Sequence, residues 1–151
     1  MKTVTAVLSA AVLAVLATAV VAQTPGNPGA PTAASPARHE IVVSYFHGDF
    51  RCATCKKIEA YSREAVEKTF AKELATGRLA FKAVNIDRAE NEHFIHDYSL
   101  VTRSLVVTEE TDGKVVRWTN LDKIWELVRG DQQAFTDYVA AGVRAYLGPA
   151  S

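Results

Sequence analysis

The pattern of hydrophobic and polar positions divides residues 38–148 into seven predicted elements. Apolar β-branched runs and two-residue alternation predict strands at 41–47, 79–86, 105–108 and 115–118. Apolar positions at helical spacing predict helices at 52–76 and 90–98, and a final helix interrupted at Gly130. Asn120 and Asp131 precede the two segments of that last helix and are their candidate caps.

The order strand, helix, strand, helix, strand, strand, helix predicts an α/β fold. Strands joined through a helix pair in parallel, and the Asp112-Gly113 turn is typical of an antiparallel hairpin. We therefore expect a three-layer sandwich, with a mixed four-stranded sheet and helices on both faces. The apolar run around Val84 predicts that the second strand lies inside the sheet. The loop after the first strand should lie at the carboxyl edge of the sheet, where α/β proteins place their sites.

The N-terminal stretch has a different composition from the rest of the chain. An uncharged run rich in Ala, Val and Leu follows Lys2, which predicts a signal peptide over residues 1–22 with cleavage after Ala22. The alternative is an uncleaved membrane anchor, because the run is about as long as the roughly 20 residues that span a bilayer. Residues 23–37 are rich in Pro and Ala and predict a linker. We expect one exported domain over 38–148, periplasmic or secreted.

The charge and the cysteine content reduce the number of functions that fit the sequence. The chain has 17 Lys and Arg against 17 Asp and Glu, so its charge predicts no nucleic-acid partner. Its two cysteines are Cys52 and Cys55, at the start of the first predicted helix. A disulfide across so short a loop would stabilise the fold by only about 2 kcal/mol. The pair therefore indicates chemistry more than a structural crosslink.

A helix start favours a reactive thiol, because unpaired backbone N–H groups and the helix dipole stabilise a thiolate. We expect Cys52 to attack a substrate disulfide as the nucleophile and Cys55 to resolve the mixed disulfide, leaving a Cys52–Cys55 disulfide. Arg51 is the candidate stabiliser of the Cys52 thiolate. These roles predict a thiol–disulfide oxidoreductase or redox partner that acts on protein or small-molecule thiols and disulfides. A membrane or periplasmic redox partner would exchange electrons with it.

Two other functions remain open from the residues alone. Two thiolates and an imidazole suit copper or zinc, so Cys52, Cys55 and His47 form an alternative metal site. A non-catalytic interaction module that uses the predicted hairpin and Trp118 is the other alternative.

Three segments carry a resemblance to a known superfamily. Residues 45–57, with their Phe-His-Gly and Arg-Cys-Ala-Thr-Cys sequences, resemble the active-site segment of thioredoxin-like proteins. Residues 84–87 resemble the end of the second strand in those proteins, and 98–105 resemble the approach to their third strand. Through these features and the Arg-Ser-Leu-Val sequence at 103–106, the chain is most similar to the exported group called the nitrophenyl compound nitroreductase subunit ArsF family. No flavin-binding pattern is present, so the resemblance implies thiol redox chemistry without a cofactor.

The chain departs from the thioredoxin pattern beside the cysteines. Arg103 and Ser104 stand in the neighbourhood where thioredoxins carry a cis-proline that faces the dithiol. Phe50 and Arg51 replace the tryptophan that precedes the first cysteine in those proteins. These departures make Arg103 and Ser104 candidate neighbours of an atypical dithiol.

A third departure concerns proton transfer. Tyr45 stands where thioredoxins carry a buried acidic residue that helps to move protons from the second cysteine. Proton transfer at Cys55 therefore needs another group, and Asp49 and His47 are the nearby candidates.

Overall fold

The computed structural model describes residues 38–148, and the predicted signal peptide and linker lie outside the described residues. None of the helices in this part of the chain is both long and apolar enough to span a membrane. The elements follow in chain order: β1 (His39–His47), α1 (Ala53–Thr69), α2 (Ala71–Ala75), β2 (Leu79–Asn85), the 3₁₀ turn η1 (Ala89–Asn91), α3 (His93–Asp97), β3 (Ser104–Thr111), β4 (Lys114–Asn120), α4 (Ile124–Leu127) and α5 (Gln132–Leu147).

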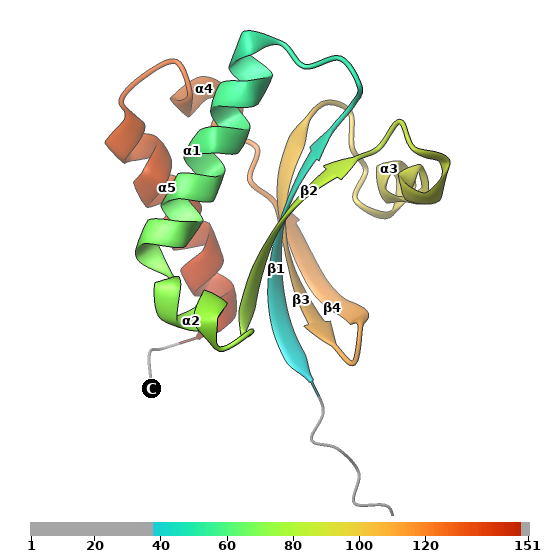
Figure 1. Ribbon diagram of the computed structural model, residues 1–151, viewed down its shortest axis with the longest axis vertical. Helices are drawn as coiled ribbons and strands as arrows, with labels where there is room; N and C mark the ends of the chain where they lie inside the picture. Colours follow the sequence, from blue (N-terminus) through green and yellow to red (C-terminus); the bar gives the residue numbers. More distant parts are fainter. Residues whose placement is uncertain (1–37, 149–151) are drawn as a thin grey trace, which may run out of the picture. The chain divides into compact units, whose positions relative to one another are not determined.

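The four strands form one mixed sheet in the order β2-β1-β3-β4 (Figure 1). β1 and β2 are parallel, with His47 opposite Asn85 at their carboxyl ends. β3 runs antiparallel to both β1 and β4. This topology confirms the predicted α/β, thioredoxin-like fold. It also places the loop after β1 at the carboxyl edge of the parallel pair, as the sequence predicts.

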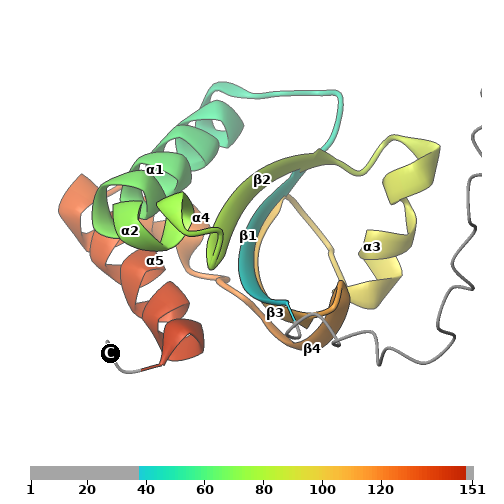
Figure 2. The ribbon, with the colours of Figure 1, turned by 60° about the horizontal axis from the view of Figure 1, so that its bottom comes forward.

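Helices cover both faces of the sheet, which gives the three predicted layers. α1 and α5 pack side by side on one face, and α3 lies on the other (Figures 1 and 2). Side chains alternate between the faces along β1, so Tyr45 enters the large core beneath α1 and α5 while Phe46 enters a smaller cluster beside α3. The loop between β1 and α1 therefore starts from a strand buried on both sides.

The position of β2 corrects one prediction. The apolar run around Val84 predicts an interior strand, whereas β2 lies at an edge of the sheet. β1 takes the interior place because β3 pairs with its other side. Several side chains of β2 are partly or fully exposed, in keeping with its edge position.

Two helix boundaries also differ from the predictions. The predicted helix at 52–76 breaks at Phe70, where the chain turns into α2 and the Phe70 ring is buried in the core. Asn120 does not cap the next helix, because it is the last residue of β4 and pairs with Val106. The Leu121 N–H continues this pairing by donating to the Leu105 carbonyl at 2.8 Å, so α4 begins only at Ile124.

The turn and the second cap confirm their predictions. Asp112 and Gly113 have φ angles of 51° and 75°, the left-handed conformation that the hairpin turn requires. The Asp131 carboxylate accepts a hydrogen bond from the Ala134 N–H at 3.2 Å and so caps α5. Beyond the turn, Trp118 on β4 is 40% exposed. Its ring and the Tyr98 ring pack in a T-shaped arrangement, with their centroids 5.3 Å apart.

Candidate active site

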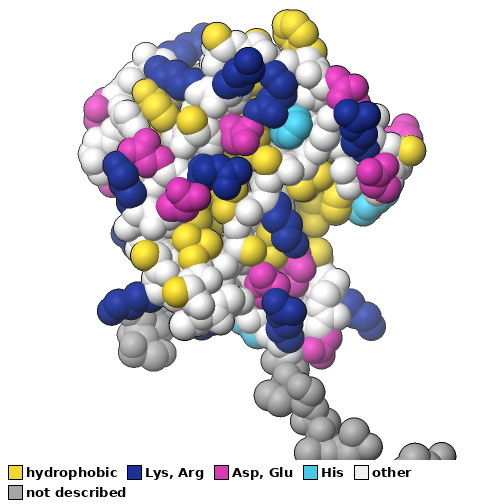
Figure 3. All heavy atoms as spheres, in the orientation of Figure 1, with side chains coloured by type: hydrophobic (Ala, Val, Ile, Leu, Met, Phe, Trp, Pro, Cys, Tyr) yellow, Lys and Arg dark blue, Asp and Glu magenta, His cyan; other side chains and the backbone are white. Residues whose placement is uncertain are grey.

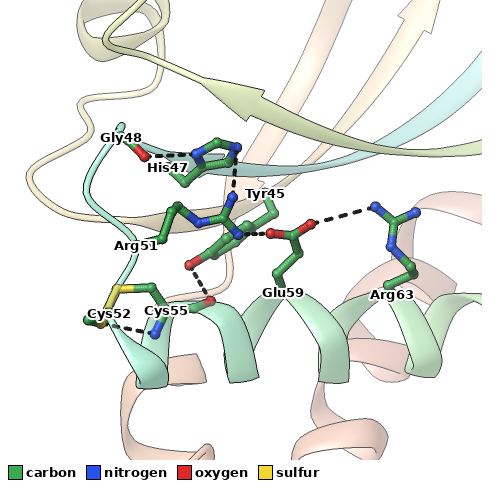
Figure 4. A network of polar contacts seen from close by, with 8 residues as sticks. All are labelled: Tyr45, His47, Gly48, Arg51, Cys52, Cys55, Glu59 and Arg63. Carbon is green, nitrogen blue, oxygen red and sulfur yellow. Dashed lines mark hydrogen bonds and ion pairs between the residues drawn. A yellow bond between two sulfur atoms is a disulfide. The ribbon is translucent and has the colours of Figure 1, made fainter.

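The end of β1 and the start of α1 place the two cysteines at the carboxyl edge of the sheet. Cys52 is the N-cap of α1, and Cys55 lies in its first turn. The two form a disulfide, with their Cα atoms 5.0 Å apart (Figure 4). Cys55 is buried at 3% exposure, whereas Cys52 is partly exposed. A substrate from solvent therefore meets Cys52 first, in line with its predicted role as the nucleophile.

The sulfur of Cys52 occupies the acceptor position of the helix cap. The Cys55 N–H donates to the Cys52 Sγ at 3.0 Å. In the reduced protein the same N–H and the positive end of the α1 dipole would face the Cys52 sulfur. A thiolate accepts a hydrogen bond better than a thiol does, so this geometry favours the reactive form of Cys52.

Tyr45 lies beneath the disulfide and holds the backbone of Cys55. Its hydroxyl donates to the Cys55 carbonyl at 2.9 Å, and its side chain is fully buried. Burial raises the pKa of Tyr45 to about 12, although the nearby Arg51 guanidinium opposes this shift. Tyr45 is therefore a neutral hydrogen-bond donor over the physiological pH range. It supports the position of Cys55 and cannot act as the acidic residue that it replaces.

Arg51 enters a polar network on the sheet side of α1 (Figure 4). Its Nη2 donates to the Glu59 carboxylate, and its Nη1 donates to His47 Nε2 at 3.4 Å. The other oxygen of Glu59 lies 3.7 Å from an Arg63 Nη. The positive charge of Arg51 is thus shared with a carboxylate. Its prediction as the stabiliser of the Cys52 thiolate stays a prediction.

His47 makes two hydrogen bonds, and neither involves the disulfide. Its Nδ1 donates to the Gly48 carbonyl at 3.0 Å, and its Nε2 lone pair faces Arg51. Both contacts fit the neutral imidazole with the proton on Nδ1. Across residues 38–148, no three His, Cys, Asp or Glu side chains are grouped as metal ligands. The two cysteines are joined in a disulfide here, so the alternative copper or zinc site of Cys52, Cys55 and His47 stays a prediction for the reduced protein.

Asp49 belongs to a second group of contacts, at the end of β2. Its carboxylate accepts from Asn85 Nδ2 at 2.7 Å and lies 3.3 Å from an Arg88 Nη. Its backbone N–H donates to the Asp87 carboxylate at 2.7 Å. These contacts tie the loop after β1 to the neighbouring strand. A role for Asp49 or His47 in proton transfer stays a prediction.

Arg103 is the last residue of the loop before β3, and Ser104 is the first residue of β3. The Arg103 Nη2 donates to the Phe50 carbonyl at 3.3 Å, so it joins the two loops beside the disulfide. Ser104 is buried, and its hydroxyl donates to the Thr102 carbonyl at 2.9 Å. The structure thus brings both predicted residues to the loops around the disulfide. There Arg103 makes a polar bridge, whereas a proline side chain would have no donor to make one.

Two residues of the site have no counterpart in the sequence predictions. Glu59 lies one helical turn after Cys55, and this spacing alone could have placed it on the same face of α1. Trp125 on α4 donates from its indole N–H to the Arg103 carbonyl at 2.8 Å. No sequence pattern predicts that contact, because its acceptor is a backbone atom.

No protein-family model matches the chain, and no curated protein matches it. Among solved structures, it is similar to a malarial protein, with 14% identity over 72% of this chain and 99% of the other and a TM-score of 0.43.

Two thioredoxins are also among the similar structures. A mutant thioredoxin from Halobacterium salinarum has 19% identity over 74% of this chain and 79% of its own, with a TM-score of 0.42. The thioredoxin of Fasciola hepatica has 19% identity over 66% of this chain and 81% of its own, with a TM-score of 0.31. The strand order and the Cys52–Cys55 disulfide of this chain themselves fit a redox role.

Proposed function

We propose that this chain is a thiol–disulfide oxidoreductase whose reactive pair is Cys52 and Cys55. The observation that carries the proposal is the cap geometry, in which the partly exposed Cys52 sulfur accepts the Cys55 N–H at the start of α1. A sulfur in this position is stabilised as a thiolate and is accessible to a substrate.

The exchange proceeds in two balanced steps. The Cys52 thiolate attacks one sulfur of a substrate disulfide, forms a mixed disulfide and releases the first substrate thiolate, which takes a proton from water. Cys55 then gives its proton to water and attacks the Cys52 sulfur as a thiolate. The bond between Cys52 and the substrate breaks, the second substrate half leaves as a thiolate that takes a proton from water, and the Cys52–Cys55 disulfide forms. The substrate gains the two electrons that the protein dithiol loses, and the reverse sequence oxidises a substrate dithiol.

A redox titration of the domain, with rapid mixing of its variants, tests this proposal. The domain equilibrated in defined thiol buffers should show one two-electron couple. Cys52→Ser should abolish exchange with a disulfide substrate, whereas Cys55→Ser should accumulate a mixed disulfide on Cys52, detectable by mass spectrometry. Absence of the couple, or exchange by Cys52→Ser at the rate of the unmodified domain, would contradict the proposal.

We further propose that the domain acts after export, with its signal peptide removed after Ala22, as the composition of residues 1–22 supports. Membership of the nitrophenyl compound nitroreductase subunit ArsF family, an electron-exchanging membrane or periplasmic partner, and protein or small-molecule thiol substrates belong to the same proposal. Mass spectrometry of protein from the extracytoplasmic fraction should find Gln23 at the N-terminus. A chain retained in the membrane with Met1 intact would favour the anchor instead.

A further inference from the structure

A hollow of about 400 Å³ lies along the N-terminal half of α1, on the side that carries the Arg51–Glu59 pair. Its lining residues are Arg51, Lys56, Glu59, Ala60 and Arg63. Arg51 and Lys56 directly flank the Cys52–Cys55 segment in sequence. The volume falls within the roughly 300–1,000 Å³ of small-molecule sites. A molecule whose disulfide reacts at Cys52 could therefore extend into this hollow.

The charge of the hollow selects the kind of molecule. Three lining side chains are cationic and one is a carboxylate, a net charge of +2. Glu59 is shared between Arg51 and Arg63, and Glu67, which does not line the hollow, also pairs with Arg63. With Glu67 included, the net charge around the hollow is +1. Within residues 38–148, Lys56 makes no ion pair or side-chain hydrogen bond. On the face drawn in Figure 3, Lys and Arg side chains gather around the N-terminal half of α1.

The arrangement of the donors suits a carboxylate. The Glu59 carboxylate holds the guanidinium groups of Arg51 and Arg63, and the Arg63 guanidinium also lies over the Phe81 ring at 4.6 Å. A guanidinium has five N–H donors. Arg51 also contacts His47 Nε2, and Arg63 also lies 3.8 Å from the Glu67 carboxylate, so each arginine offers a ligand only the N–H groups that remain beyond these contacts. These positioned groups, with the unpaired Lys56 ammonium, can accept a ligand carboxylate without first breaking the Glu59 pairs.

We infer that this hollow binds the carboxylate arm of small anionic disulfides and thiols, and that these are preferred substrates of the dithiol. The inference rests on the proposed function for its exchange step. In that step one sulfur of the anionic disulfide bonds to Cys52 while its other half leaves as a thiol, as described above. The hollow contributes affinity for the charged arm, and the sulfur chemistry remains at Cys52.

A competition between disulfides of different charge tests the inference. Reduced protein is mixed with oxidised glutathione, which carries more carboxylates than amino groups, or with neutral hydroxyethyl disulfide, and the two rate constants are compared as a ratio. Lys56→Gln should lower this ratio by about twofold to fivefold, the effect of one exposed ion pair. A change in the reactivity of the Cys52 thiolate alters both rates together and cancels in the ratio. Raising the salt concentration should reduce the preference of the unmodified protein.

Lys57→Gln is the matched control. Lys57 has the same charge and is the next residue along α1, but its ammonium lies over the Tyr61 ring at 5.1 Å and does not line the hollow. Its replacement should leave the ratio unchanged. An equal fall for Lys56→Gln and Lys57→Gln would overturn the inference, because it would indicate general attraction to positive charge. An unmodified protein that shows no preference for the anionic disulfide would overturn it as well.

A binding measurement separates this inference from the proposed function. S-methylglutathione carries the same carboxylates but no reactive sulfur, and it is titrated into the oxidised protein with backbone amide signals as the readout. Signals of residues 56–63 should shift, while those of Gln132, Gln133 and Thr136, which line another hollow together with Glu64 and Lys68, should not. Binding without any disulfide exchange would refute only the proposed function. Exchange with both disulfides, but no shift at 56–63, would refute only the anion site.

Discussion

The two loops that meet at the disulfide are held in different ways. In the loop after β1, residues 48–52, side chains make the contacts: Asp87 accepts the Asp49 N–H, Asn85 donates to the Asp49 carboxylate, and Glu59 binds Arg51. In the loop before β3, residues 99–103, two side chains from outside the loop bind backbone carbonyls, as His47 and Arg103 also do at the Gly48 and Phe50 carbonyls of the first loop. Trp125 donates to the Arg103 carbonyl, and Ser104 donates to the Thr102 carbonyl.

This difference indicates how each loop responds to substitution. Contacts to the first loop come from β2, the segment that follows it and α1, so the loss of one leaves others in place. The second loop is bonded by Ser104 to the Thr102 carbonyl and by Arg103 to the Phe50 carbonyl, but its contact from α4 comes through a single indole, that of Trp125. We therefore expect replacement of Trp125 to destabilise the protein more than replacement of a residue in the first loop, although Trp125 lies farther from the cysteines along the chain.

The largest expected effect is that of Trp125→Ala. It removes the hydrogen bond to Arg103 and the packing of the indole against the main core, so the free energy of unfolding should fall by about 2–4 kcal/mol. Trp125→Phe keeps most of the packing and should lower it by about 1 kcal/mol. Urea denaturation measures both values.

Amide hydrogen exchange at residues 100–104 shows where the Trp125 variants act. Exchange in this loop should accelerate in both variants, whereas exchange at 48–52 should change less. Equal acceleration in the two loops would break the comparison, because Trp125 would then support the whole site and not one loop.

Gly48→Ala tests the first loop and should have the next largest effect. A Cβ at Gly48 would lie 2.6 Å from the Asp87 carboxylate oxygen that accepts the Asp49 N–H. Asp87 would have to move and weaken this hydrogen bond, so the free energy of unfolding should fall by about 1–3 kcal/mol.

Gly130→Ala is the control for Gly48→Ala. The nearest atom to a Cβ at Gly130 is the Leu127 carbonyl oxygen, at an ordinary 3.7 Å. This replacement should stabilise the protein by about 0.4–1 kcal/mol, because it restricts the unfolded chain. If chemical denaturation gave the two variants equal stability, the close approach of Asp87 would not be a constraint on the first loop.

The two loops also illustrate which features of the fold and the site can be predicted from the sequence. The alternation of strands and helices, the Asp112-Gly113 turn and the cysteines at a helix start each depend on residue types close together in sequence, and all were predicted. The edge position of β2 was not, because an apolar run does not say which neighbour pairs with it. The Trp125 contact was not predicted either, since a backbone carbonyl is common to every residue. Glu59 was within reach through its spacing from Cys55.

Tyr45→Phe tests a hydrogen bond to a backbone carbonyl next to the first loop, since the Tyr45 hydroxyl donates to the carbonyl of Cys55. The variant keeps the buried ring and removes the hydrogen bond to the Cys55 carbonyl. The free energy of unfolding at neutral pH should fall by about 1 kcal/mol. A loss similar to that of Trp125→Phe would show that the hydrogen bonds to the Cys55 and Arg103 carbonyls contribute equally to stability. The number of contacts would then make the difference between the two sides of the site.

The raised pKa of Tyr45 also predicts how the stability of the protein changes at alkaline pH. Burial raises its pKa from 10.0 to about 12, so the folded protein holds the phenol proton more tightly than the unfolded chain does. The resulting stabilisation is complete below pH 10 and is lost as the pH rises from about 10 to 12. The unmodified protein should lose more stability over this interval than Tyr45→Phe. Burial also raises the pKa of Tyr138, whose hydroxyl donates to Asp122, so Tyr138→Phe is the matched control and should keep the ionisation step near pH 12 in absorbance titration. If the step near pH 12 survived in Tyr45→Phe, the Tyr45 phenol would not be the group that ionises there.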